Sequence, residues 1–169
     1  MGCDIHSYVE VRRNGTWQRL TDPVFPSAYA AEPATTEPFD WRNYGLFGFL
    51  ADVRNHSHSP VIAEPRGLPD DADMLPFERE AALWCDHHSH SWLTLAELLA
   101  CDYDQVFWDR RVTKEIVPGH FDGAALADEG EGAHPTLREF LGEHYFRRLN
   151  DLSKLGDPQD VRVVFWFDN

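Results

Sequence analysis

The C-terminal end of the chain carries the sequence feature that most limits its fold. Residues 161–167 read Val-Arg-Val-Val-Phe-Trp-Phe, a run of β-branched and aromatic residues that favours a strand. Nearly every position is apolar, so this strand is suited to the middle of a sheet, where both faces are covered. The segment therefore predicts partner strands on either side and a layer of helix against the sheet.

The N-terminal segment supplies the expected partner. Residues 3–12 alternate in polarity, which predicts a strand, and Asn14-Gly15 favours a type I′ turn into a return strand over 16–20. One face of the first strand shows Asp4, His6, Tyr8 and Glu10. We interpret Asp4 and His6 as candidate metal ligands or acid–base groups, and Glu10 as a solvent-facing residue.

Four helices are expected, and two of them have strong start signals. Thr94 with Glu97 and Thr136 with Glu139 each match the S/T-x-x-E capping box, in which each residue satisfies a backbone N–H of the other. The predicted helices cover residues 44–53, 76–84, 94 to about 100, and 136 to about 150.

Proline and glycine mark the long loops. Residues 21–43 and 59–76 each contain four prolines, and residues 118–134 are rich in glycine and acid without periodicity. We expect the 21–43 loop to run over the surface. Together the segments predict one α+β domain over residues 1–169, with a small, mostly antiparallel sheet (N-terminal hairpin plus C-terminal strand) packed on two or three helices.

The net charge limits the partners. At −14, the protein should repel a phosphate backbone, which argues against non-specific nucleic-acid binding. The chain has no apolar run long enough for a membrane span and no secretory signal, and its three cysteines show no paired spacing. We therefore expect a cytoplasmic protein with reduced thiols; a homo-oligomer stays open.

The densest candidate chemistry is the segment Cys85-Asp86-His87-His88-Ser89-His90, just before the capped helix at Thr94. Imidazole is the commonest metal ligand and titrates near neutral pH, so Asp86, His88 and His90 are candidate catalytic or metal-binding residues on a short rigid loop. A second His-Ser-His lies at His56 and His58, and Asp52 precedes it. The opposing interpretation is a set of ordinary surface histidines, because the spacing matches no named metal motif.

Several blocks resemble a family of small proteins encoded mostly by bacteriophages and prophages. They are Met1-Gly2-Cys3-Asp4-Ile5-His6, Asn43-Tyr44-Gly45-Leu46-Phe47, residues 50–55, residues 65–71 and His88-Ser89-His90-Ser91-Trp92-Leu93-Thr94-Leu95. The resemblance implies the cytoplasm of an infected bacterium and a connection with nucleotides or host defence signals. It brings no assigned activity and no catalytic residues.

Three functions are compatible with these observations. The first is a metal-dependent hydrolase of a phosphoester or small nucleotide, with Zn²⁺, Mn²⁺ or Mg²⁺ held by Asp4, His6, Asp86, His88 and His90. Arg54 and Arg66 would bind phosphate, with Trp92 and Tyr44 as further ligand-binding residues; a metal-free variant would use His88 or His90 as general acid or base. The second is a non-catalytic sponge for a signalling nucleotide, and the third is an acidic inhibitor of a host defence protein. Convergence of Asp4 and His6 with His88 and His90 would favour the first.

Overall fold

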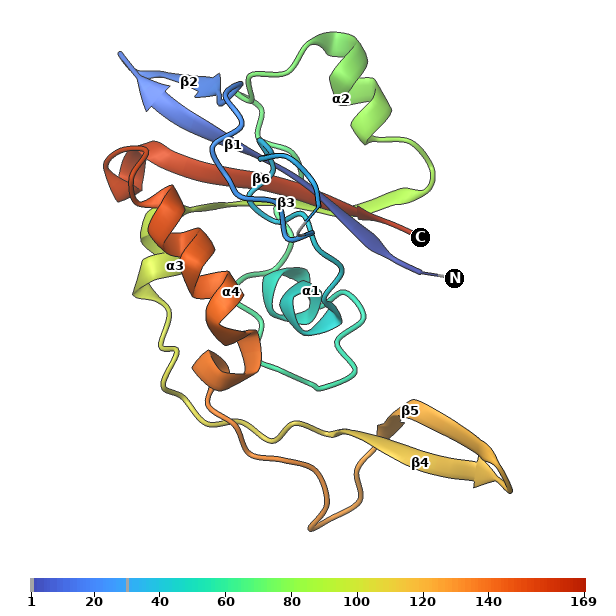
Figure 1. The fold of residues 1–169 in the computed structure, drawn as a ribbon. Helices are drawn as coiled ribbons and strands as arrows, with labels where there is room; N and C mark the ends of the chain where they lie inside the picture. The colour runs from blue at the N-terminus through green and yellow to red at the C-terminus, as the bar shows by residue number, and fades with distance from the viewer. Residues whose placement is uncertain (1, 30) are drawn as a thin grey trace. The chain divides into compact units, whose positions relative to one another are not determined.

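The computed structural model describes residues 2–29 and 31–169, and its main element is a four-stranded antiparallel sheet (Figure 1). Its strands are β1 (Asp4–Arg13), β2 (Thr16–Arg19), β3 (His87–Thr94) and β6 (Val161–Asp168), in the order β2-β1-β6-β3. The C-terminal run is thus an inner strand, as predicted, and the N-terminal hairpin is confirmed. Met1, the first residue of the block that resembles phage proteins, and Ala30 of the 21–43 loop lie outside the described residues.

The helices confirm the α+β class. They are α1 (Tyr44–Ala51), α2 (Pro76–Ala82), α3 (Leu95–Ala100) and α4 (Leu137–Leu152), with a 3₁₀ turn at Pro158–Asp160 before β6. Both capping boxes form: Thr94 Oγ1 accepts from the Glu97 N–H at 3.2 Å, and Thr136 Oγ1 accepts from the Glu139 N–H at 3.2 Å. None of the helices over residues 2–29 and 31–169 is long and apolar enough to cross a membrane.

The chain divides into two compact units. One contains Met1–Arg42, Pro65–Cys101 and His144–Asn169, and hence the four-stranded sheet; the other contains Asn43–Glu64 and Asp102–Glu143. The boundary in α4 falls next to Gly142, whose backbone has φ 75° and interrupts the helix. Glycine suits this position because a β-carbon makes such a φ costly.

The second unit holds α1 and a two-stranded antiparallel sheet of β4 (Arg111–Val117) and β5 (His120–Leu126). β5 corrects the prediction of an unstructured loop over 118–134: the Pro118-Gly119 turn, with Gly119 at φ 79°, returns the chain along β4.

One face of the four-stranded sheet is apolar and buried. Phe165 and Phe167 have no exposed surface, and the Ser7 hydroxyl on the same face donates to the Phe39 carbonyl at 2.9 Å. The Phe39 ring stacks on Tyr145 of α4 at 6.2 Å between centroids. The 21–43 segment is a loop with many exposed residues, as expected, but it also contributes to the core, because Phe25 and Phe39 are fully buried.

The opposite face carries the polar side chains of β1, but Glu10 is not exposed to solvent. Its carboxylate is fully buried and accepts from Arg162 Nε at 2.6 Å and from the Asp73 N–H at 2.6 Å. The expectation of a solvent-facing Glu10 was wrong, because an arginine inside the C-terminal apolar strand needs a buried anion beside it.

The histidine-rich segment is also different from the prediction. It is strand β3, not a loop, and it pairs with the end of β6. His88 lies opposite Phe167 and Ser91 opposite Phe165, so two residues of β3, Ser89 and His90, face Trp166 alone. Ser89 has φ 52°, as expected of a β-bulge, and the bulge changes which histidines share a face.

Candidate metal centre

Three side chains meet where β1, β3 and β6 run side by side at one end of the sheet. His6, His87 and Asp168 each offer a ligand atom, and the three atoms lie within 4.8 Å of one another. The strand register brings them together, because His6 is paired with Trp166, and Asp168 pairs with both Asp4 and His87. All three are partly exposed, so an ion can reach them from solvent. We call this set the metal triad.

The chemistry of the triad suits a divalent transition metal. Two imidazoles and one carboxylate are the ligands of many catalytic zinc and non-haem iron sites, which leave further positions for water or substrate. The His6 Nε2 atom lies 3.0 Å from Asp168 Oδ2, so a histidine–carboxylate pair is already formed.

The ring of His87 is held in one tautomer. Its Nδ1 lies 3.0 Å from the Ala82 carbonyl oxygen at the end of α2, and a carbonyl can only accept. Nδ1 therefore carries the proton, and in the neutral ring Nε2 keeps its lone pair for a metal. A backbone carbonyl that fixes the far nitrogen is the usual support of a metal-ligating histidine. The same carbonyl also lies 2.7 Å from His90 Nε2.

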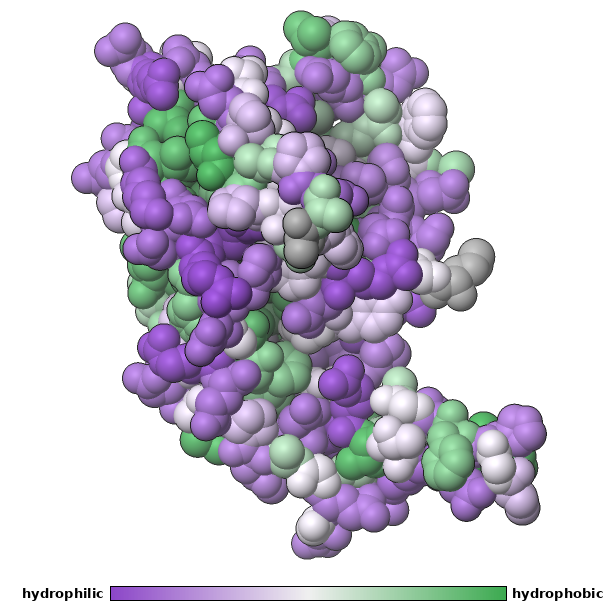
Figure 2. Space-filling model, in the orientation of Figure 1, coloured by the Kyte–Doolittle hydropathy of each residue, from purple (hydrophilic) through white to green (hydrophobic). Residues whose placement is uncertain are grey.

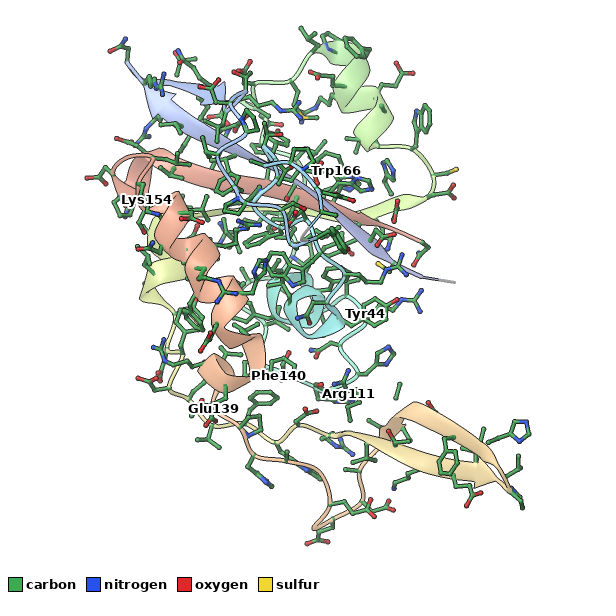
Figure 3. All side chains as sticks on the ribbon, in the orientation of Figure 1. Tyr44, Arg111, Glu139, Phe140, Lys154 and Trp166 are labelled. Carbon is green, nitrogen blue, oxygen red and sulfur yellow. The ribbon has the colours of Figure 1, made fainter. Side chains whose placement is uncertain are left out.

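Trp166 of β6, labelled in Figure 3, packs beside His6, His87 and His90. Its ring is nearly parallel to the rings of His6 and His90, at 5.5 Å and 6.2 Å between centroids. It also lies 6.3 Å from the His87 ring. The indole, on the inner strand β6, thus lies between His6 of β1 and His90 of β3.

The surroundings of Asp168 favour its ionised form. Burial alone would raise its pKa, but the hydrogen bonds from His6 and from the Asp4 N–H outweigh burial and hold the pKa of Asp168 below its usual value. Glu37, a half-buried carboxyl whose charge interacts with His6, shows the opposite change, because burial raises its pKa. An ionised Asp168 is the form that binds a cation.

The structure brings together only some of the residues predicted from the sequence. His6 and His90 flank Trp166, and Asp4 lies beside Asp168, its N–H donating to Asp168 Oδ1 at 3.1 Å. His88 points to the opposite face, where its ring stacks on Phe167 at 6.1 Å and its Nε2 is buried without a hydrogen-bond partner.

Asp86 does not join the triad either. It is exposed and accepts a weak hydrogen bond from the Cys85 thiol, with 3.7 Å between Sγ and Oδ1. Sequence reasoning missed His87 and Asp168, since both depend on the pairing of β3 with β6. The signal that could have found Asp168 is its place at the end of the C-terminal strand, antiparallel to the strand that begins at Asp4.

The predicted phosphate and aromatic contacts lie elsewhere. Arg66 is paired with Glu97 through two hydrogen bonds, of 2.6 Å and 3.2 Å, and its guanidinium lies 5.0 Å from the centre of the Trp92 ring. Arg54 and Tyr44 belong to the second unit, where the Tyr44 ring lies 6.2 Å from His56.

The second unit has a hollow of its own. It encloses about 410 Å³ and is lined by Asp52, Asn55, His58, Ser59 and Val61. The Asn55 side chain shapes it by donating to Asp52 Oδ1 at 2.8 Å and to the Ser59 carbonyl at 3.0 Å. Asp52 and His58, from the second His-Ser-His segment and the residues before it, thus line this hollow, and neither is a member of the triad.

Apolar side chains are exposed on α2, close in sequence to His87. Figure 2 shows apolar residues at the surface over this helix, and Phe77 and Trp84 are 66% and 65% exposed. The end of α2 contacts β3 through the Ala82 carbonyl, which lies within hydrogen-bond distance of His87 and His90.

Searches against protein-family models, curated proteins and solved structures found no match for the chain.

Proposed function

We propose that the protein is a metal-dependent hydrolase that acts on a phosphoester or small nucleotide, with the metal held by His6, His87 and Asp168. The observation that carries the proposal is the convergence of these three side chains within 4.8 Å, together with the Ala82 carbonyl that leaves His87 Nε2 ready to bind. A bound Zn²⁺ or Mn²⁺ would supply an acidified water and neutralise phosphate charge.

The residues of the chain have separate roles in this proposal. His6 and His87 provide nitrogen ligands, and metal binding displaces to solvent the proton that His6 Nε2 donates to Asp168. Asp168 provides a carboxylate that already accepts from the Asp4 N–H. His90 shares the Ala82 carbonyl with His87, so it positions the end of α2 beside the ligand set. The resemblance to phage proteins makes a host signalling nucleotide the natural substrate to test.

The experiment uses chelator-treated protein with Mn²⁺ or Zn²⁺ added back. We expect hydrolysis of bis(4-nitrophenyl) phosphate, and of a panel of cyclic and linear dinucleotides, to depend on the metal and to fall at least about a hundredfold in His87→Ala. His120→Ala is the matched control, because His120 is exposed on β5 and should keep full activity.

The outcomes separate the alternatives. Turnover that persists without metal would contradict the proposal and point to the His6–Asp168 pair as a metal-free general base. Nucleotide binding without turnover would identify a sponge. A protein that binds neither metal nor nucleotide, yet co-purifies with a host protein, would support the acidic inhibitor.

A further inference from the structure

An arginine, Arg42, is linked to the metal triad through Asp4 and also packs against Gly2. The Arg42 guanidinium donates to Asp4 through both oxygens, with Nε 2.8 Å from Oδ1 and Nη2 2.5 Å from Oδ2. Asp4 in turn donates its N–H to Asp168 Oδ1 at 3.1 Å. Asp4 therefore connects the guanidinium of Arg42 with the carboxylate of Asp168.

Gly2 lies against the same guanidinium. A β-carbon at Gly2 would lie 2.6 Å from Nη1 and 2.9 Å from Cζ of Arg42, closer than non-bonded atoms approach. A side chain at residue 2 would make the end of this flexible arginine shift. Asp4 orients Arg42 and Gly2 leaves room for the guanidinium, which gives a physical reason for both residues in the Gly-Cys-Asp-Ile-His opening.

Charge makes this arginine useful to the site. The protein carries a net charge of −14, and the triad contains the carboxylate of Asp168 with Asp4 next to it. An anionic substrate would be repelled there unless cations compensate, and a planar guanidinium binds two phosphoryl oxygens at once. About half of the Arg42 side chain is exposed, so a substrate can reach it while Asp4 holds it in place.

We infer that Arg42 binds the phosphoryl oxygens of the substrate and makes the site selective for anionic phosphoesters over neutral esters. The inference rests on the proposed function. In it, Arg42 takes the place of Arg54 and Arg66 as the phosphate-binding residue. Arg42 positions the phosphoryl group and supplies positive charge to it. Asp4 holds the guanidinium, and Gly2 leaves room for it.

The test compares two substrates in the metal-loaded enzyme, bis(4-nitrophenyl) phosphate and the neutral 4-nitrophenyl acetate. We expect Arg42→Gln to raise KM for the phosphate about tenfold or more, the change typical of losing hydrogen bonds to a charged group, and to leave the neutral ester unaffected. Arg42→Lys should recover part of the loss. Gly2→Ala, which changes no charge, should raise KM for the phosphate in the same direction by displacing the guanidinium.

Arg12→Gln is the matched control, because Arg12 is a similarly exposed arginine on β1 that is paired with Asp160. An equal rise of KM in Arg12→Gln would mean that only net charge matters and would overturn the inference. Loss of turnover on both substrates in Arg42→Gln would also overturn it, since it would indicate a structural role.

Failure of the proposed function can be distinguished from failure of the inference about Arg42. If the wild-type protein hydrolyses neither substrate, that function is refuted, and an NMR titration of the arginine Nε–H signals with inorganic phosphate tests Arg42 by itself. Weaker phosphate binding in Arg42→Gln, with Arg12→Gln unchanged, would support the inference; equal binding in all three proteins would refute it.

Discussion

His144 of α4 is kept neutral by its surroundings. Its Nε2 is buried without a hydrogen-bond partner, and its ring meets the Trp41 ring edge-on at 4.3 Å between centroids. Burial lowers the pKa of His144, and the positive charges of Arg148 and Arg147 lower it further, while Asp40 opposes them. This half-buried histidine therefore packs against Trp41.

The depressed pKa of His144 predicts a pH-dependent stability. The pKa of His144 in the unfolded chain is about 6.5. Below that pH His144 binds a proton more readily in the unfolded chain than in the folded one. The free energy of unfolding therefore falls as the pH drops towards the pKa of His144 in the folded chain. His144→Gln should therefore reduce the loss of stability between about pH 7.5 and pH 5. Urea unfolding at several pH values, with chelator present, measures this, and an unchanged pH dependence would contradict it.

The choice of ligands at the triad could be predicted only in part. His6 followed from simple alternation along the first strand. His87 did not, because alternation pairs His88 with His90, and the bulge at Ser89 instead places His87 and His90 on one face and His88 on the other. A bulge depends on the partner strand, so the local sequence does not reveal it.

At the scale of elements, a buried ion pair ties β1 to β6. Glu10 and Arg162 are almost completely buried, and the Arg162 guanidinium lies 4.1 Å from the centre of the Trp17 ring and 5.5 Å from that of Trp92. Arg162 Nη1 also lies 2.9 Å from Asp71 Oδ1. This arrangement fixes the register of the two strands that carry His6 and Asp168.

Glu10→Gln should destabilise the protein by about 3–5 kcal/mol, because it leaves the Arg162 charge buried with only its partly exposed partner Asp71. Chemical unfolding monitored by circular dichroism gives the free energy. The matched control is Asp160→Asn, which breaks the exposed pair with Arg12 and should cost less than about 1 kcal/mol. Equal losses in the two variants would show that burial of the pair does not matter.

Local sequence signals made most helices predictable. The features that the sequence did not predict depend on long-range contacts. The capping boxes at Thr94 and Thr136 operate within four residues, so they could be recognised in the sequence. The partners of Glu10, and the burial of Phe25 and Phe39 in a proline-rich segment, depend on residues far away in the chain. They become visible only when the sheet is assembled.

At the scale of the whole molecule, stability should be uneven. The two-stranded sheet of β4 and β5 exposes Ile116 and Phe121, each at 65%, whereas the side chains of β6 are almost all buried. A two-stranded sheet without a covering layer is marginally stable in water. The sequence predicted the α+β class, but not this division into two compact units.

Backbone amides of residues 111–126 should therefore exchange with solvent far faster than those of residues 161–168, by about a hundredfold or more. Hydrogen–deuterium exchange followed by mass spectrometry compares the two peptides in one sample. Similar protection in both peptides would mean that β4 and β5 are covered in solution, by a second copy of the chain or another partner.

The central claim is that His6, His87 and Asp168 bind one metal ion. An anomalous difference map from crystals soaked in Zn²⁺, collected at the zinc edge, tests it most directly. We predict a peak within about 2.0–2.2 Å of a ligand atom from each of the three residues, and its loss in His87→Ala. A zinc peak elsewhere, with these three side chains unoccupied, would contradict the account.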